Sequence, residues 1–404
     1  MFSPRFIKSV AALTCRAFSQ QGKAPDMAEG NAHLLVTNVR NRLRQIVGAS
    51  TNWKDHQQAL AERTCLSKHL ANSQEELPTK TMKESEIEVH LPLGTQPSLR
   101  EKYLNFHNSV RFGRILEDLD SLAALVDKID MRRNIILPDC DIKFTGHVTW
   151  VGKTSIEAKM HMTQFHDGAY TPVLDATFVM VARDPENKRA AFVNPLKLET
   201  PEEEKIFQQG EINKTRRVEL STASLLRVAP TAEERTLVHS LFLNTLDVKT
   251  VSFRGRILPP NSVWMEDAKL KGLEICHPQE RNIFNRIFGG FLMRKARRGR
   301  PPPLFVAAAP PLFSHIITNF YSPVEIGSLL LLSSQVCYTE EHHVQVRVHT
   351  EVLDPLTRQH NTTNVFHFTF QVDKPVPAVV PQSYGESMLY LDGKRHFDEM
   401  MKSQ

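Results

Sequence analysis

The sequence has little that could build a disulfide framework, a metal centre or a membrane span. Its five cysteines are far apart, form no CxxC pair and are odd in number, which argues against disulfide pairing and against a zinc site. The longest apolar stretches, such as residues 326–334, fall well short of the roughly 20 residues that cross a bilayer. The 17 histidines show no ligand spacing, and no nucleotide-binding loop is present. We therefore expect no metal, no cofactor and no membrane span.

The overall charge does not require a nucleic-acid partner. The net charge of +5 is modest for 404 residues, and part of it lies in two clusters, at the N-terminus and at residues 294–300. Residues 298–301 read Arg-Gly-Arg-Pro, the core of an AT-hook, which can enter an A·T-rich minor groove. A four-residue pattern inside a folded domain is weak evidence, and a solvated basic linker is the competing interpretation. Nucleic acid is not among the expected partners.

The first 25 residues are typical of a mitochondrial presequence. They contain no acidic residue, and their basic side chains are Arg5, Lys8, Arg16 and Lys23. The apolar residues that can share the opposite face of a helix are Phe6, Val10, Ala11 and Leu13. A basic, amphipathic segment without acids predicts import into mitochondria rather than secretion. A disordered basic tail is the alternative.

Two segments of the chain resemble each other. The pattern Asn105-x-x-Asn108-x-Val110-x-x-Gly113 recurs 177 residues later, ending at Gly290. Further on, the pattern of residues 144–152 (Phe-x-x-x-Val, ending in Gly) recurs in residues 320–327. An internal repeat constrains the whole fold more strongly than a single motif does.

Each copy continues into segments with the period of two that is typical of half-buried strands. These segments are residues 155–162 and 175–182 in the first copy, and 344–349 and 365–372 in the second. We expect an α+β fold of two tandem domains, each an antiparallel sheet wrapped around one helix. The predicted divisions are residues 80–195 and 263–380 for the domains, 196–262 for an ordered connector, and 381–404 for a C-terminal segment that packs on the second domain. Within the connector, Thr231 and Glu234 form a plausible capping box for a helix that ends near Leu243.

The helix that Gly113 opens carries an acid among core-facing residues. Its apolar face comprises Ile115, Leu116, Leu119, Leu122 and Ala123. Asp120 lies seven residues after the glycine, which is about 10.5 Å along a helix. Taken alone, Asp120 is more often an acid that favours the helix dipole or a surface ion pair.

Several long stretches of the sequence resemble the tandem hotdog acyl-CoA thioesterases. They are RFGRILEDLDSLA, DIKFTGHVTWVG, PVLDATFVMVA, NPLKLE, WMEDAKLKGLEICHPQERNIFNRIFGGFLMRKA, SSQVCYT, NVFHFTF and YGESMLYLDG. The resemblance covers most of residues 80–398. It implies two hotdog domains, an acyl-CoA substrate, hydrolysis of fatty acyl-CoA to free fatty acid and coenzyme A, a mitochondrial location, most plausibly the matrix, and assembly into homo-oligomers.

The resemblance also implies a site built from both copies. Asp120 would be the general base for a water molecule, and the backbone N–H of Gly290 would bind the thioester carbonyl. Asn282 would position the water or the carbonyl, although it could simply cap the turn. The catalytic set implied for the chain is therefore Asp120, Asn282 and Gly290.

A reciprocal site would use Asn105 and Gly113 with an acid at position 297 or 298. Those positions are Arg297 and Arg298, so at most one site has its base.

The chain departs from the family along both central helices. In the first copy, the helix runs directly into residues 124–131, so about twenty residues of the family pattern are missing. In the second copy, residues 297–321 replace the rest of the helix with a basic and proline-rich segment. The alternative hypothesis is a catalytically impaired hotdog protein that binds acyl-CoA or a partner without turnover.

Overall fold

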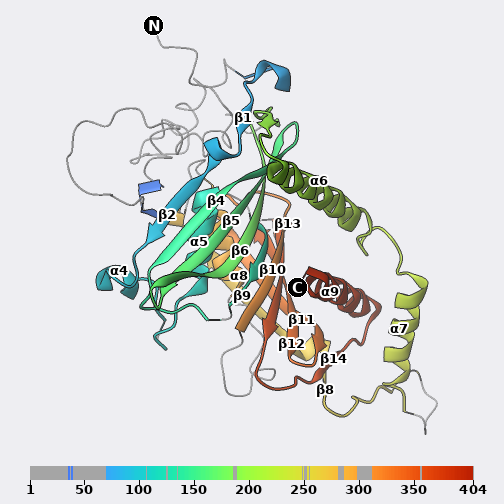
Figure 1. The fold of residues 1–404 in the computed structure, drawn as a ribbon. Coiled ribbons are helices and arrows are strands. Elements are labelled where there is room, and N and C mark those ends of the chain that lie inside the picture. The colour runs from blue at the N-terminus through green and yellow to red at the C-terminus, as the bar shows by residue number, and fades with distance from the viewer. Residues whose placement is uncertain are drawn as a thin grey trace, which may run out of the picture. The chain divides into compact units, whose positions relative to one another are not determined.

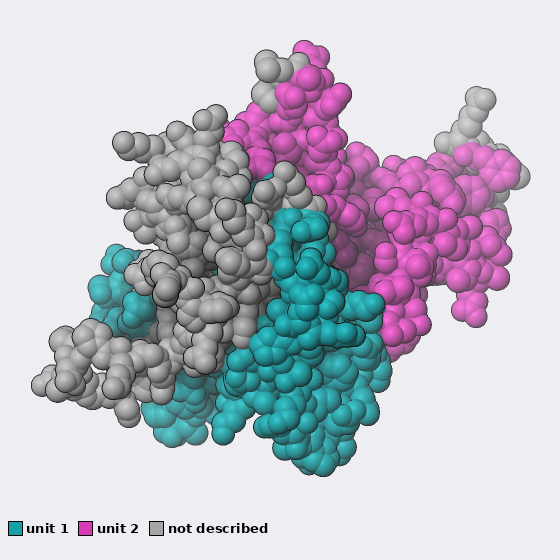
Figure 2. All heavy atoms as spheres, turned by 90° about the horizontal axis from the view of Figure 1, so that it is seen from above, with its two compact units in different colours: residues 1–214, 277–294 teal, residues 215–276, 295–404 magenta. Residues whose placement is uncertain are grey.

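The computed structural model describes two compact units. Unit 1 comprises residues 1–214 and 277–294, and unit 2 comprises residues 215–276 and 295–404 (Figure 2). Within these limits the described residues are 35–36, 38–39, 70–105, 107–123, 126–133, 135–184, 189–247, 249, 253, 255–280, 286–297, 312–354 and 357–403. The predicted presequence, Asn282 and Arg298 lie outside them, as does the side chain of Ala123.

Unit 1 contains a five-stranded antiparallel sheet in the order β2-β4-β5-β6-β3 (Figure 1). A short parallel pair joins β1 and β7. The strands are β1 (Lys80–Thr81), β2 (Ile87–Leu91), β3 (Val126–Met131), β4 (Ile142–Val151), β5 (Ser155–His166), β6 (Ala169–Val181) and β7 (Leu196–Lys197). The helices are α4 (Pro97–Glu101) and α5 (Phe112–Ala123), with single 3-10 turns η3 (Gln74–Glu76), η4 (Lys83–Ser85) and η6 (Pro278–Glu280).

Unit 2 repeats this arrangement, with strand order β9-β11-β12-β13-β10 and a parallel pair of β8 and β14. Its strands are β8 (Ser262–Trp264), β9 (Lys269–Ile275), β10 (Leu312–Phe320), β11 (Leu329–Glu340), β12 (His343–Leu353), β13 (His360–Gln371) and β14 (Ala378–Val380), with η5 (Met265–Asp267). Its helices are α7 (Ala232–Leu243) and α9 (Tyr384–Ser403). Helices α6 (Pro201–Thr222) and α8 (Gly289–Ala296) contribute residues to both units.

The two sheets have the same topology, strand for strand. Both also contain a bulge at matching places, between Val148 and Trp150 in β4 and between Val336 and Tyr338 in β11. The predicted internal repeat is therefore confirmed. So is the α+β fold class, since each repeat is an antiparallel sheet of the hotdog type.

One predicted part of the repeat is wrong. Residues 144–152 lie in and just after β4, whereas residues 320–327 span the end of β10 and its connection to β11. By its place in the strand order, β4 of the first copy is equivalent to β11 of the second, not to β10. The false match arose because apolar residues followed by glycine occur wherever a strand meets a turn, and Gly327 indeed has a positive φ of 84°.

The alternating segments form the strands that their period predicted. In β5, Ile156, Ala158, Met160 and Met162 are buried. In β12, Val344, Val346 and Val348 are buried in the same way. The sheet of each unit thus presents one apolar face to its core.

Helix α5 is buried on all sides rather than on one stripe. The apolar residues Ile115, Leu116 and Leu119 are fully buried, as predicted, and α5 contacts β3 and β5. Its acids are also buried, with exposed fractions of 3% to 5% for Glu117, Asp118 and Asp120. Acids are rarely buried without partners, so the surroundings of α5 must satisfy three carboxylates.

The connector and the C-terminal segment are helical. Thr231 and Glu234 form the predicted capping box of α7, which ends at Leu243. Helix α9 packs on β11, β12 and β13, as predicted for the C-terminal segment. Among the described cysteines, Cys140, Cys276 and Cys337 are buried free thiols. No helix in the described part of the chain is long and apolar enough to cross a membrane.

Helix α6 meets β4 through a glycine. A Cβ atom on Gly210 would lie 2.3 Å from the Cβ of Trp150, so only glycine allows this approach. The indole N–H of Trp150 donates a hydrogen bond to Oε1 of Glu211 at 2.8 Å, which holds the same contact.

We predict that Gly210→Ala lowers the free energy of unfolding by about 1–3 kcal/mol, because it overpacks this contact. Gly272→Ala is the matched control, since a Cβ there would meet nothing within 4 Å. Urea denaturation followed by tryptophan fluorescence measures both changes. Equal midpoints for the two variants would contradict the prediction.

Candidate active site

The three buried acids of α5 each have a defined partner in unit 1. Asp118 accepts a hydrogen bond from the hydroxyl of Tyr103 at 2.7 Å. Glu117 pairs with Arg114 at 2.7 Å and with Arg294 at 2.6 Å. Asp120 meets a backbone donor of α8 (Gly289–Ala296).

Asp120 and Gly290 lie in direct contact. The backbone N–H of Gly290 donates a hydrogen bond to Oδ2 of Asp120 at 2.8 Å. A Cβ on the neighbouring Gly289 would lie 3.3 Å from both carboxylate oxygens. The first N–H groups of a helix have no partner within the helix, and its dipole favours negative charge there. The start of α8 therefore favours a negatively charged group, and in the structure that group is the carboxylate of Asp120.

The contact depends on a close approach between the backbones of α5 and α8. A Cβ on Gly290 would lie 2.6 Å from the Cα of Glu117, closer than real atoms pack. At the equivalent place in the first copy, a Cβ on Gly113 would lie 2.7 Å from Cγ of Arg294. Both glycines of the repeated pattern are thus favoured by packing between the two helices.

The arrangement suits proton abstraction next to an oxyanion site. The carboxylate of Asp120 accepts a hydrogen bond from the backbone N–H of Gly290, the group that would also bind a carbonyl oxygen. A carbonyl oxygen that took the N–H of Gly290 would displace the carboxylate from it, and the carboxylate could then accept a proton from a nearby water molecule. Catalytic hydrogen bonds are often arranged differently before substrate binds.

Asn282 lies outside the described residues, but the described residues on either side of it keep the register of the repeat. The N–H of Phe288 donates to the carbonyl of Glu280 at 3.0 Å. In the first copy, Arg111 donates to Tyr103 in the same way. The donor and the acceptor in the second copy each lie 177 positions after the donor and the acceptor in the first copy, since 288 − 111 and 280 − 103 both give 177.

The asparagine of the first copy shapes its own loop. Oδ1 of Asn105 accepts hydrogen bonds from the N–H groups of His107 at 2.8 Å and Ser109 at 3.0 Å. Asn105 therefore has the turn-capping role that was the simpler interpretation of its counterpart, Asn282.

The reciprocal site would have an arginine at the position where it needs a general base. Helix α8 ends at Ala296, and Arg297 comes next in a turn, with its guanidinium 5.9 Å from the centroid of the Phe313 ring. An arginine cannot accept a proton at neutral pH. The prediction that the second site lacks its acid rests on the sequence. The structure places Arg297 directly after the end of α8.

The sequence reasoning missed the ion pair between Glu117 and Arg294. Their positions differ by 177, the offset of the repeat, so they are equivalent positions with opposite charge. The side chains are only 4% and 20% exposed. Extending the repeat four residues past each glycine would have shown opposite charges at these equivalent positions, but not that the two side chains are in contact.

We predict that Gly290→Ala lowers the free energy of unfolding by about 2–3 kcal/mol, because the new Cβ would force the backbones of α5 and α8 apart. The control Gly289→Ala meets only the flexible end of Asp120 and should cost less than about 1 kcal/mol. Thermal unfolding of both variants measures the difference. A larger loss for Gly289→Ala would contradict the close contact between the two backbones.

Comparison with known proteins identifies relatives over nearly the full chain. Acyl-coenzyme A thioesterase 9, mitochondrial, from Bos taurus is 60% identical over 396 residues, which is 90% of this chain and 89% of the relative. The protein of the same name from Homo sapiens is 57% identical, over 94% of this chain and 92% of the relative. Acyl-coenzyme A thioesterase 10, mitochondrial, from Mus musculus is 57% identical, over 91% of this chain and 89% of the relative.

More distant comparisons add less. No family model matches the sequence. A solved acyl-CoA hydrolase from Bacillus cereus is 21% identical, covers 36% of this chain and 97% of its own, and superposes with a TM-score of 0.29. The assignment rests on the sequence relatives, which confirm the resemblance drawn from the long sequence stretches: the chain belongs to the acyl-coenzyme A thioesterase family, alongside the mitochondrial members 9 and 10.

Proposed function

We propose that the chain hydrolyses fatty acyl-CoA thioesters to free fatty acid and coenzyme A, with Asp120 as general base and the N–H of Gly290 as oxyanion donor. The observation that carries the proposal is the 2.8 Å contact between these two groups at the start of α8. It brings a buried carboxylate and a helix N-terminus together in a chain of the thioesterase family.

In the proposed reaction, the thioester carbonyl oxygen takes the N–H of Gly290. Asp120 removes a proton from a water molecule, whose oxygen then forms a bond to the carbonyl carbon. The N–H of Gly290 and the dipole of α8 stabilise the resulting oxyanion. When the carbon–sulfur bond breaks, the proton held by Asp120 passes to the thiolate of coenzyme A. Asn282 is assigned to hold the water or the carbonyl.

Each chain would contain one working site. The second site would need an acid where Arg297 stands, and the glycine there, Gly113, faces the side chain of Arg294. The electrostatics at that position favour an anion but provide no base.

We infer that the chain acts in the mitochondrial matrix. The basic, acid-free first 25 residues support import, and the relatives from cattle, human and mouse are named as mitochondrial.

A second candidate function is binding of acyl-CoA without turnover. Two observations favour it. Helix α8 ends at Ala296 after eight residues, and only two residues separate α5 from β3 (Val126–Met131). Both changes shorten the elements that carry the proposed site. The rate of thiol release from acyl-CoA separates the two functions.

We predict that Asp120→Asn lowers kcat for acyl-CoA hydrolysis by a factor of about 10²–10⁴, the usual contribution of a general base. Release of free thiol from acyl-CoA by the purified chain measures the rate. Asp118→Asn is the matched control, because it changes a neighbouring buried acid on the same helix and the amide oxygen can still accept the hydrogen bond from Tyr103.

Three outcomes would decide between the proposals. No thiol release by the unaltered chain, with acyl-CoA still bound, would support the non-catalytic function. A wild-type rate in Asp120→Asn would remove the base from the mechanism. A rate close to half would show that the reciprocal site also works.

We also infer that the chain assembles into a homo-oligomer. Strand β9 pairs on one side with β11, and its apolar residues Leu270, Leu273 and Ile275 are 49%, 58% and 52% exposed. An apolar strand at the edge of a sheet favours association. We expect light scattering to give a mass of at least two chains, and a monomeric mass at micromolar concentration would contradict this.

A further inference from the structure

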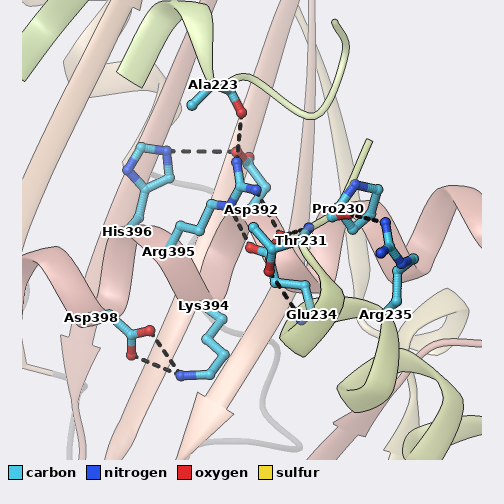
Figure 3. A network of polar contacts seen from close by, with 10 residues as sticks. All are labelled: Ala223, Pro230, Thr231, Glu234, Arg235, Asp392, Lys394, Arg395, His396 and Asp398. Carbon is cyan, nitrogen blue, oxygen red and sulfur yellow. Dashed lines mark hydrogen bonds and ion pairs between the residues drawn. The ribbon is translucent and has the colours of Figure 1, made fainter. Parts of the chain in front are cut away.

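A second cluster of chemically capable side chains lies in unit 2, and it uses no residue of the proposed active site. Asp392 and His396 are one turn apart on α9, and His367 lies on β13. One potential ligand atom from each residue lies within 4.8 Å of the other two. Figure 3 shows Asp392 and His396 extending from the same helix toward each other.

The separations in this cluster are too long for hydrogen bonds but suit a shared cation. Nε2 of His367 is 3.6 Å from Oδ2 of Asp392, and Nε2 of His396 is 3.8 Å from Oδ1 of the same carboxylate. A zinc ion holds imidazole nitrogen and carboxylate oxygen at about 2.0–2.2 Å each, so tetrahedral ligands are roughly 3.4 Å apart. Small side-chain rotations would reach that geometry.

His367 is buried and His396 is half-buried, and each imidazole has one ring nitrogen without a hydrogen bond. His367 is 3% exposed, and Nδ1 of both His367 and His396 is buried with no hydrogen-bond partner. Their ring centroids are 3.8 Å apart. No hydrogen bond at Nδ1 therefore holds either ring in place, so each can rotate to bring Nε2 toward a cation shared with Asp392.

Burial favours the neutral form of His367, which is the form that binds metals. Burial lowers its pKa well below the usual value, and the neighbouring His396 and Arg347 lower it further. A neutral imidazole has a lone pair to donate, whereas an imidazolium has none.

Two contacts fix the helix that supplies two of the three groups. A Cβ on Gly393 would lie 2.6 Å from Sγ of Cys337, so this glycine brings α9 close to β11. Arg395 makes two hydrogen bonds to Glu234 of α7, at 2.6 and 2.8 Å, and a third to the carbonyl of Ala223 at 2.7 Å (Figure 3). The positive charge of Arg395 is therefore already paired beside the cluster.

Arg347 competes with a bound cation for Asp392. Its Nε lies 3.7 Å from Oδ2 of the carboxylate, too far for a hydrogen bond but close enough to repel a cation. It should weaken cation binding without blocking it, and so it provides an experimental handle.

We propose that His367, Asp392 and His396 form a binding site for a divalent transition metal of the zinc class, which would hold α9 against β13. Two imidazoles and one carboxylate are a ligand set that Zn²⁺ and Co²⁺ accept. Sequence reasoning did not find this ligand set, because its third member, His367, is on a strand and lies 25 positions before Asp392 in the chain.

The test is titration of the untagged, metal-stripped full chain with Co²⁺, monitored by visible absorption. We expect one equivalent to bind at micromolar concentration with the intense bands of a four-coordinate site. His396→Gln and Asp392→Asn should each weaken binding at least about tenfold, since each removes a ligand. His360→Gln is the control, because its side chain is 44% exposed and outside the cluster.

Arg347→Gln gives an effect of the opposite sign. Removing the competing charge should tighten Co²⁺ binding about tenfold. A role limited to folding would not predict weaker binding in one variant and tighter binding in another. Stoichiometric Zn²⁺ should also raise the melting temperature of the unaltered chain but not that of His396→Gln.

The proposal is overturned if the chain takes up no Co²⁺ at about 100-fold excess over the micromolar affinity expected. It is equally overturned if bound Co²⁺ has the same affinity and spectrum in His396→Gln and Asp392→Asn as in the unaltered chain. Neither result depends on thioesterase activity, so a failure here leaves the proposed function to its own test.

Discussion

The close approach of α5 and the first turn of α8 is the constraint on which the rest of unit 1 depends. A Cβ on Gly290 would lie 2.6 Å from the Cα of Glu117, so the glycine is what lets the two backbones meet. The same approach places the N–H of Gly290 on the carboxylate of Asp120. The contact between the two backbones and the hydrogen bond to Asp120 therefore both result from the absence of a side chain at Gly290. It also explains why α5 can bury three acids, because each meets a donor that the approach or its own loop supplies.

The two copies of the repeat have diverged in charge where they face each other. Glu117 and Arg294 occupy equivalent positions and form a buried ion pair. Asp120 is equivalent to Arg297, since 297 − 120 also gives 177. If each helix met an identical copy of itself, Glu117 would face a second Glu117 and Arg294 a second Arg294. The like charges would then repel each other. Opposite charges instead favour the contact between Glu117 and Arg294, and only one of the positions 120 and 297 carries an acid. The duplication has thus produced a specialised pair rather than two equal halves.

The sequence predicted local elements well and long-range contacts poorly. The apolar period of α5, the alternation in β5 and the capping box at Thr231 all depend on neighbours within a few residues, and all are confirmed. The false match between residues 144–152 and 320–327 arose because a strand ending in a glycine turn is a common local pattern. The Glu117–Arg294 pair and the cluster around His367 join distant segments, and no local period marks such contacts. The repeat offset was a long-range signal that the residues themselves carried, and it related Gly113 to Gly290. The contact of Asp120 with Gly290 was implied by the family resemblance and not by the offset.

The truncation of α8 matters less to the proposed chemistry than its length suggests. The donor is the N–H of the second residue of the helix, and the effect of a helix dipole on a charge falls off within the first turn. Gly289 to Arg294 provide that turn and the partner of Glu117. The reciprocal site would need an acid just beyond Ala296, at a position where this chain has Arg297. The basic and proline-rich segment therefore begins after the residues that the proposed site uses, so the lack of a second site does not imply the loss of the first.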